Sequence, residues 1–250
     1  MATDEKSPRF ARLHGRFERR AVRFALAILV VLSVGGIVEV APLFALENTV
    51  EKVEGMRPYT PLELAGRAVY IREGCYVYHS QQIRPFRDEV ERYGPYSLAA
   101  ESMYDHPFQW GSKRTGPDLA RVGNKYSDDW HVRHLLNPRD VVPASIMPSY
   151  AFLATTPLRV ERIDRLMRTH QRVGVPYTEE QLANARADLV AQAGSADDAT
   201  EMLGRYPKAQ ARNFDGQPGL TEMDALVAYL QMLGTLVEFD WRRPRPDMVR

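Results

Sequence analysis

An apolar stretch near the N-terminus constrains this chain more than any other feature of its sequence. Residues 24–38 read FALAILVVLSVGGIV, and beyond Glu39 the stretch resumes as VAPLFAL. A helix over residues 24–46 is about 34 Å long at ~1.5 Å per residue, enough to cross a hydrocarbon layer of roughly 30 Å. A cleaved signal peptide has a shorter core, and the LFALE sequence fits a cleavage site poorly. The stretch therefore predicts an uncleaved transmembrane helix over residues 21–46, with a buried core helix as the alternative.

Basic residues dominate the segment before this stretch, and an excess of positive charge keeps such a flank in the cytoplasm. We therefore expect residues 1–20 to be a cytoplasmic N-terminus and residues 47–240 to form a periplasmic domain at a bacterial inner membrane. Residues 241–250 are expected to be a C-terminal tail. The cations are Lys6, Arg9, Arg12, Arg16, Arg19, Arg20 and Arg23, against the acidic residues Asp4, Glu5 and Glu18.

Two residues interrupt the apolar stretch. A carboxylate at membrane depth is costly, so Glu39 either contacts a partner subunit or lies at the headgroup boundary. Pro42 lacks a backbone donor and is expected to end the regular helix or to kink it.

Composition excludes several classes of function. The net charge is +1 and no phosphate-cradling glycine loop is present, so we expect no nucleic-acid partner. A single cysteine, Cys75, cannot form a disulfide within the chain. No nucleophile–base pair and no motif of paired carboxylates is found, so the domain is not expected to be an enzyme on its own.

The segment GCYVYHSQ, residues 74–81, resembles a site of covalent haem attachment. The attachment motif reads C-x-x-C-H, in which two thiols bond the porphyrin vinyls and the histidine binds iron. Cys75 and His79 occupy the first and last positions, but Tyr78 stands where the second cysteine belongs. Three interpretations follow: a site that works with one anchor, a site that has lost its haem, or a coincidence.

Two helices are expected to frame the domain. Thr60, followed by Pro61 and Glu63, predicts the start of a helix that ends near Gly74, and Thr221 predicts the start of another within residues 219–235. Between them we expect a loop-rich region over residues 85–123, a short helix over 130–136, and a block over 155–218 that packs on a partner or on the domain surface. The helices expected in that block cover residues 158–173, 178–192 and 197–205.

Candidate iron ligands follow from the same order of elements. His79 supplies one axial position, and Met147, in a proline-rich loop, is the best candidate for the other. Gly116 and Pro117 lie between them, and a carbonyl there can accept from the second ring nitrogen of His79. The other methionines considered, Met167, Met202, Met223 and Met232, fall in helical patterns.

Three further histidines are expected to have no metal. His131 and His134 form an H-x-x-H pair, but no carboxylate or thiol joins them, so solvated side chains are the preferred interpretation. His106 is expected to be a loop residue.

Longer segments resemble one protein family. VGGIVEVAPLF, EGCYVYHSQQIRP, the segment from DHPFQW to SIMPSY, and DALVAYLQMLGT together resemble subunit II of the cbb3-type cytochrome c oxidases, their membrane-anchored mono-haem c subunit. The resemblance covers about residues 20–240, and the 155–218 block is similar to alphaproteobacterial versions. It implies an all-α fold, with one transmembrane helix and a class I cytochrome c-like domain that carries a helical insertion.

The resemblance also implies partners and roles. Cys75 would form a thioether to one haem c, and His79 and Met147 would be the axial ligands. The transmembrane helix would pack against a catalytic subunit with two b-type haems and copper. Electrons would come from a di-haem c subunit or a soluble cytochrome donor and continue towards oxygen reduction.

Tyr78 departs from the family pattern, which has cysteine there. With one thioether the second vinyl stays free, and the haem is either held by Cys75 alone or bound without a covalent link. The favoured function is an electron-transfer subunit. A haem-free structural subunit of the same complex, and an anchored periplasmic binding module without a redox role, are the alternatives.

Overall fold

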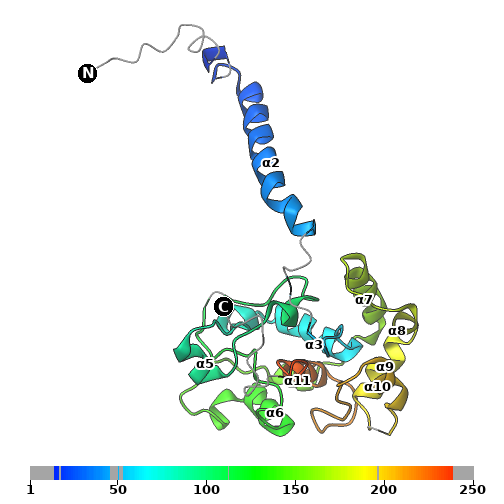
Figure 1. Ribbon diagram of the computed structural model, residues 1–250. Coiled ribbons are helices and arrows are strands. Elements are labelled where there is room, and N and C mark those ends of the chain that lie inside the picture. Colours follow the sequence, from blue (N-terminus) through cyan, green and yellow to red (C-terminus); the bar gives the residue numbers. More distant parts are fainter. Residues whose placement is uncertain are drawn as a thin grey trace. The chain divides into compact units, whose positions relative to one another are not determined.

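The computed structural model describes residues 14–16, 18–45, 50, 53–111, 113–195 and 197–238. Their contacts divide the chain into two compact units, Met1–Val50 and Glu51–Arg250. The described residues are helical and contain no β-strand, only an isolated antiparallel bridge between Pro157 and Thr221 (Figure 1). The predicted all-α fold with one apolar N-terminal helix is therefore confirmed. The predicted tail over residues 241–250 and most of the predicted basic N-terminus lie outside the described residues.

The first unit contains helix α2, which runs Ala21–Ala45. Its segment Ala21–Leu43 is long and apolar enough to cross a membrane. Pro42 lies inside α2, so the regular helix does not end there as one alternative proposed. The ring removes one hydrogen bond close to the end of the helix, where the last turn tolerates the loss. The side chain of Glu39 is exposed on α2.

The second unit is organised around helices α3 (Pro61–Arg72) and α11 (Glu222–Met232). Both helices begin at the predicted threonines. Thr60 Oγ1 accepts from the Glu63 amide at 3.1 Å, and Thr221 Oγ1 accepts from the Asp224 amide at 3.3 Å. Each cap satisfies a backbone donor that has no partner within the helix. The α3–α11 contact is the most extensive helix–helix contact among the described residues.

Gly66 permits the close approach of these two helices. A Cβ atom at this position would lie 1.8 Å from the carbonyl oxygen of Ala225 and 2.9 Å from Cβ of Tyr229. The rings of Tyr70 and Tyr229 pack beside this crossing, with centroids 5.5 Å apart. The backbones of α3 and α11 are therefore so close at Gly66 that no side chain larger than a hydrogen atom fits there.

The block over residues 155–218 is helical, but its helices are shorter than predicted. Residues 158–173 form the 3-10 turn η5 (Val160–Arg162) and α7 (Ile163–Arg172). The helix expected over 178–192 has the predicted cap, in which Thr178 accepts from the Gln181 amide, but it divides at Asn184 into α8 (Glu179–Ala183) and α9 (Ala185–Gln192). The last helix, α10, covers only Thr200–Arg205.

This block shares the core of the second unit. Thr60 Oγ1 donates to Gln192 Oε1 at 2.5 Å, and the Tyr177 hydroxyl donates to the Tyr59 carbonyl at 2.9 Å. Helix α3 contacts both α7 and α9, so it lies between α11 and this block. The block contributes fully buried side chains to the core, among them Met167, Leu189, Met202 and Tyr206.

The remaining elements are short. The region 85–123 is loop-rich as expected, although the helices α5 (Arg87–Tyr93) and η2 (Ala99–Ser102) were not predicted. The predicted helix over 130–136 is α6 (Asp128–Leu136), which begins earlier because Ser127 caps it. The other short elements are α4 (Cys75–Tyr78), η3 (Pro138–Asp140) and η4 (Ala151–Ala154).

The α3–α11 crossing predicts an asymmetric response to two alanine substitutions. Gly66→Ala forces a methyl group against the α11 backbone and is expected to lower the free energy of unfolding by about 1–3 kcal/mol. Gly204→Ala is the matched control, because nothing lies within 4 Å of a Cβ atom there. In the interior of α10 this change is expected to stabilise by about 0.5–1 kcal/mol. Denaturant unfolding of both variants checks this; equal effects would contradict the crossing.

Candidate functional site

A single helical turn presents the attachment segment. Gly74 adopts φ +71°, outside the range that other residues favour, and so redirects the chain at the end of α3. Helix α4 follows, and the amide of His79 donates to the carbonyl of Cys75 at 2.9 Å. Because residues four apart lie on the same face of a helical turn, Cys75 and His79 are presented together.

The two side chains at the attachment positions lie in different environments. Cys75 is 9% exposed, and burial, with the charge of Glu73 nearby, raises the pKa of its thiol to about 12. Tyr78 is 50% exposed, so its phenol ring takes no part in the core. Tyr78 contributes to the site through its carbonyl, which accepts from the amide of Gly116 at 2.9 Å.

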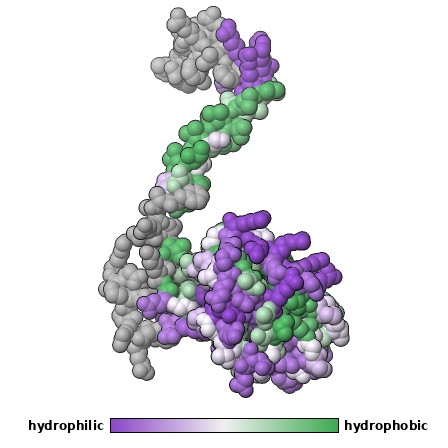
Figure 2. All heavy atoms as spheres, turned by 90° about the vertical axis from the view of Figure 1, so that its right-hand side faces the viewer, coloured by the Kyte–Doolittle hydropathy of each residue, from purple (hydrophilic) through white to green (hydrophobic). Residues whose placement is uncertain are grey.

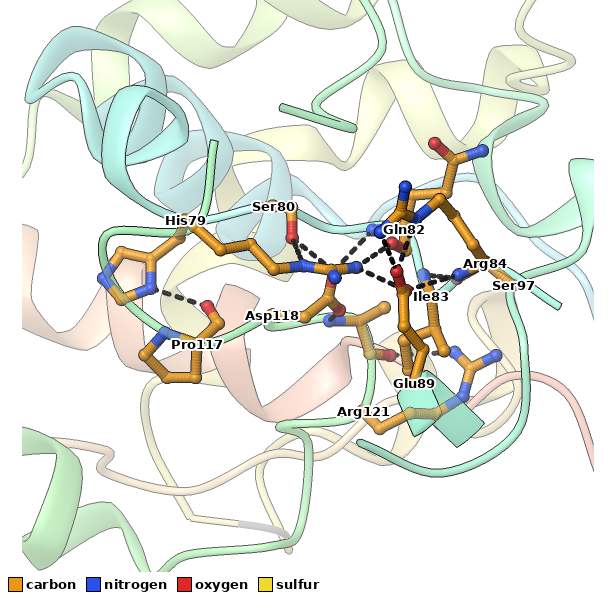
Figure 3. A network of polar contacts seen from close by, with 12 residues as sticks. His79, Ser80, Gln82, Ile83, Arg84, Glu89, Ser97, Pro117, Asp118 and Arg121 are labelled. Carbon is orange, nitrogen blue, oxygen red and sulfur yellow. Dashed lines mark hydrogen bonds and ion pairs between the residues drawn. The ribbon is translucent and has the colours of Figure 1, made fainter. Parts of the chain in front are cut away.

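The ring of His79 is held from one side. Its Nδ1 lies 2.9 Å from the carbonyl oxygen of Pro117, which assigns the proton to Nδ1 and leaves the lone pair on Nε2 (Figure 3). Gly116 lies against the same ring, since a Cβ atom there would be 2.2 Å from Cε1 of His79. Burial lowers the pKa of His79, which favours the neutral imidazole that a metal requires. The contact predicted between His79 and the carbonyl of Pro117 is present.

A polar network joins the segment after His79 to the segment around Pro117 (Figure 3). Asp118 Oδ2 accepts from Ser80 Oγ at 2.5 Å and from the Gln82 amide at 2.9 Å. Arg114 donates to Ser80 Oγ at 2.6 Å and to the Gln82 carbonyl at 2.7 Å, and it pairs with Glu89 Oε2 at 2.8 Å. These bonds fix Pro117 relative to His79. Sequence analysis did not find this network, and only the RTGPD spacing hinted at part of it.

Met147 lies in a loop that packs on the core. It is half-buried there, and its amide donates to Ser145 Oγ at 3.2 Å. Downstream, the Tyr150 amide donates to the Leu135 carbonyl at 2.8 Å, which anchors the end of this loop to the last turn of α6. Burial raises the pKa of Tyr150. The assignment of Met147 as a ligand stays a prediction.

The other histidines do not assemble a metal centre. The described residues contain no group of three or more His, Cys, Asp or Glu side chains placed to hold a metal ion. The interpretation of His131 and His134 as solvated is wrong, because α6 buries His131 and half-buries His134. Burial lowers the pKa of His131 to about 4. His106 lies in a loop as expected.

Sequence analysis also missed an aromatic stack on α6. The Tyr126 and Trp130 rings stack with centroids 4.0 Å apart, and Trp130 stacks on His134 at 4.8 Å. Burial, followed by repulsion from His79, lowers the pKa of His134. The spacing of four residues between these rings was the signal that could have revealed it.

One family of known proteins matches most of the chain. The family described as cytochrome c oxidase, mono-heme subunit/FixO, matches residues 14–237. The chain belongs to this family. No curated protein matches the chain. The resemblance to subunit II of the cbb3-type oxidases is therefore confirmed, and the cofactor of the FixO family is one haem c.

The residues of this FixO chain fit a haem in most respects. His79 offers a neutral ring with Nε2 unshared, and Gly116 leaves the space that this ring needs. Apolar side chains are exposed on the nearby loops, including Ile146 at 78%, and a flat apolar macrocycle would cover such surface. The one misfit is Tyr78, which cannot form the second thioether.

The network predicts that the stability of the fold depends on pH because of Glu89. Its hydrogen bond with Arg114, helped by Arg84, lowers the pKa of this buried carboxyl from 4.5 to about 2. Since the folded pKa lies below the unfolded one, the pair stabilises the fold above pH 4.5 and its contribution is lost as the pH falls towards 2. Glu89→Gln is expected to destabilise the protein by about 1–3 kcal/mol at pH 7 and to flatten the pH dependence in that window.

Unfolding free energies of the wild type and Glu89→Gln, measured between pH 7 and the acid limit of the fold, test this. Arg87 and Glu91 form an exposed pair at 2.7 Å nearby, so Glu91→Gln is the control and is expected to change stability little. Parallel curves for the wild type and Glu89→Gln would contradict the assignment.

Proposed function

We propose that this chain is the electron-relay subunit of a cbb3-type oxidase and that it carries one haem c at the His79 site. The observation that carries the proposal is the orientation of His79, with Nδ1 bonded to the Pro117 carbonyl and Gly116 against the ring. A carbonyl partner fixes the tautomer and raises the basicity of the ligating nitrogen. Such an arrangement suits an iron ligand better than a histidine that only fills space.

Each residue has a distinct task in this proposal. When bound, haem c supplies one-electron redox chemistry at its iron. Cys75 would link the cofactor to the chain through a single thioether, and His79 and Met147 would bind the iron. A thioether sulfur paired with imidazole raises the reduction potential. With both residues bound, the iron would have no free position for oxygen, so oxygen reduction would belong to the partner subunit.

The first unit supports a place in the membrane. Helix α2 anchors the chain, and the predicted basic flank places its N-terminus in the cytoplasm and the haem domain in the periplasm of a bacterial inner membrane. The partners we propose are the haem-copper catalytic subunit and the di-haem c subunit, with a soluble cytochrome c as a further donor. The haem that His79 and Met147 would hold would supply the one-electron carrier between these donors and the catalytic subunit.

Tyr78 favours one alternative function. A chain that cannot form two thioethers is a poor substrate for haem-attachment machinery that reads both cysteines. In that case the subunit is haem-free and stabilises the oxidase complex through α2 and the second unit. The two functions differ in a property that is measured directly, namely the mass of the chain.

Haem staining on a denaturing gel, with intact mass of the chain from the purified oxidase, tests the covalent link. We expect a stained band and a mass raised by one haem. Cys75→Ala is expected to abolish the stain because it removes the only anchor. Tyr78→Cys restores the complete motif and is expected to keep the stain and the mass increase, with more complete loading.

The outcomes separate the two functions. An unstained chain in a complex whose total haem content is one short favours the structural subunit and overturns the relay. An unstained chain in a complex with the full total haem content, in which one haem c is replaced by one non-covalent haem, favours binding by His79 and Met147 without a covalent bond.

The axial ligands make a second spectroscopic prediction. Gly116→Ala places a methyl group where the His79 ring lies, and it is expected to displace the ring and to abolish the low-spin absorption spectrum of this haem. Met147→Leu keeps apolar volume but removes the sulfur, and it is expected to retain the covalent haem while the reduction potential falls. Absorption spectra and a redox titration distinguish the two variants. A wild-type absorption spectrum and a wild-type reduction potential for both variants would contradict the assignment of His79 and Met147 as iron ligands.

A further inference from the structure

A groove on the second unit has no role in the proposed electron relay. It lies between α3 and the segment 158–169 and has a volume of about 640 Å³. Its floor is apolar and includes Ala65, Ala68 and Val69 from α3, and Leu158, Ile163 and Leu166 from the facing segment. Figure 2 shows the side of the molecule that carries α7 to α10, where apolar surface lies among strongly hydrophilic side chains.

The rim of this groove is positively charged. Arg159, Arg162 and Arg165 line it, are exposed, and have no ion pair among the described residues. The cation on the α3 side, Arg72, differs because it is neutralised by Glu222, with Nη1 to Oε1 at 2.8 Å. We call the apolar floor and these three arginines together the basic groove.

Acidic neighbours do not cancel this charge. Asp164, on the same helix as Arg165, is paired with Arg186 at 2.5 Å. Glu161, between Arg159 and Arg162 in the sequence, is exposed, and its single negative charge does not balance the three positive charges of the arginines. The basic groove therefore carries a net positive potential next to apolar surface.

A positively charged rim beside an apolar floor favours a ligand that has both an anionic group and an apolar part. Arginine guanidinium groups bind phosphate oxygens in pairs of parallel hydrogen bonds. A small anion would satisfy the rim but leave the floor in contact with water, whereas an anionic amphiphile satisfies both. A headgroup phosphate at the rim and the first carbons of an acyl chain on the floor match the two surfaces.

The chain itself supplies the source of such an amphiphile. Helix α2 is long and apolar enough to cross a membrane, so the bilayer that anchors the chain contains phospholipids with a charged headgroup and an acyl chain. Anionic lipids in that bilayer attract basic segments. We propose that the basic groove binds the headgroup of an anionic phospholipid of the membrane in which α2 is anchored.

Photo-crosslinking of the intact oxidase in nanodiscs tests the proposal. The probe is phosphatidylglycerol with a photoreactive group on its acyl chain near the glycerol, compared with the matching phosphatidylcholine. We expect the phosphatidylglycerol probe to label peptides that contain residues 65–69 or 158–166 at least fivefold more than the phosphatidylcholine probe does. Equal labelling by the two lipids, or labelling confined to α2, overturns the proposal.

Variants of α7 provide a matched control for charge. Arg162→Gln with Arg165→Gln is expected to lower labelling of the groove at least fivefold. Arg168→Gln with Arg172→Gln changes the net charge equally at exposed positions outside the groove, and labelling is expected to stay within twofold of the wild type. Equal loss in both pairs shows a general surface-charge effect and overturns a defined site.

Two further measurements separate other occupants. Ala68→Trp fills the floor without a change in charge, and it is expected to lower labelling as strongly as the loss of Arg162 and Arg165. Glycerol phosphate, which has no acyl chain, is expected to compete poorly. Complete competition by glycerol phosphate shows a free-phosphate site, and a crosslink from the groove to another oxidase subunit shows a protein interface; either result overturns the lipid assignment.

Discussion

The close crossing of α3 and α11 determines where the attachment turn of the candidate site lies. Gly66 allows the α3 backbone to meet the Ala225 carbonyl, and α3 then leads within two turns to Gly74 and the attachment turn. Helix α11 also reaches the segment beyond that turn, because the Tyr229 hydroxyl lies 3.1 Å from Gln81 Oε1. The same pair of helices thus holds the chain on both sides of His79. A shift of their crossing point would move Cys75 and His79 relative to the core, so the packing of two apolar surfaces sets the position of the proposed iron ligand.

Polar interactions hold the Pro117 segment, which the packing of α3 on α11 does not fix. Helix α5 carries Glu89, which pairs with Arg114, and Arg114 also bonds Ser80 and Asp118. These bonds join the Ser80–Gln82 segment to the Arg114–Asp118 segment. Buried charges are costly when one partner is missing, so loss of Arg114 or Glu89 would weaken the support of the Pro117 carbonyl.

Local signals in the sequence predicted part of this arrangement. The helices after Thr60 and Thr221 were predicted because a cap and its partner lie within three residues of each other. The contact between His79 and Pro117 was predicted from a short motif. The pairing of Arg114 with Glu89 could not be predicted, since it joins residues far apart in the sequence with no repeating pattern between them. Helix α5 was missed because Phe86, at its N-cap position, offers no side-chain hydrogen bond. The division at Asn184 was missed because one polar residue inside an amphipathic pattern rarely ends a helix.

The place of Tyr78 within this framework explains how the site tolerates a missing cysteine. Its only backbone contribution to the pocket is a carbonyl that accepts from the Gly116 amide, and any residue supplies that carbonyl. The phenol ring is half exposed and supports neither the α3–α11 crossing nor the Arg114 network. With tyrosine at this position, one proposed covalent link is absent, while the contact between His79 Nδ1 and the Pro117 carbonyl is present. In the proposed haem site, Cys75 would form one thioether and His79 and Met147 would both bind the iron, so three bonds would still join the cofactor to the chain.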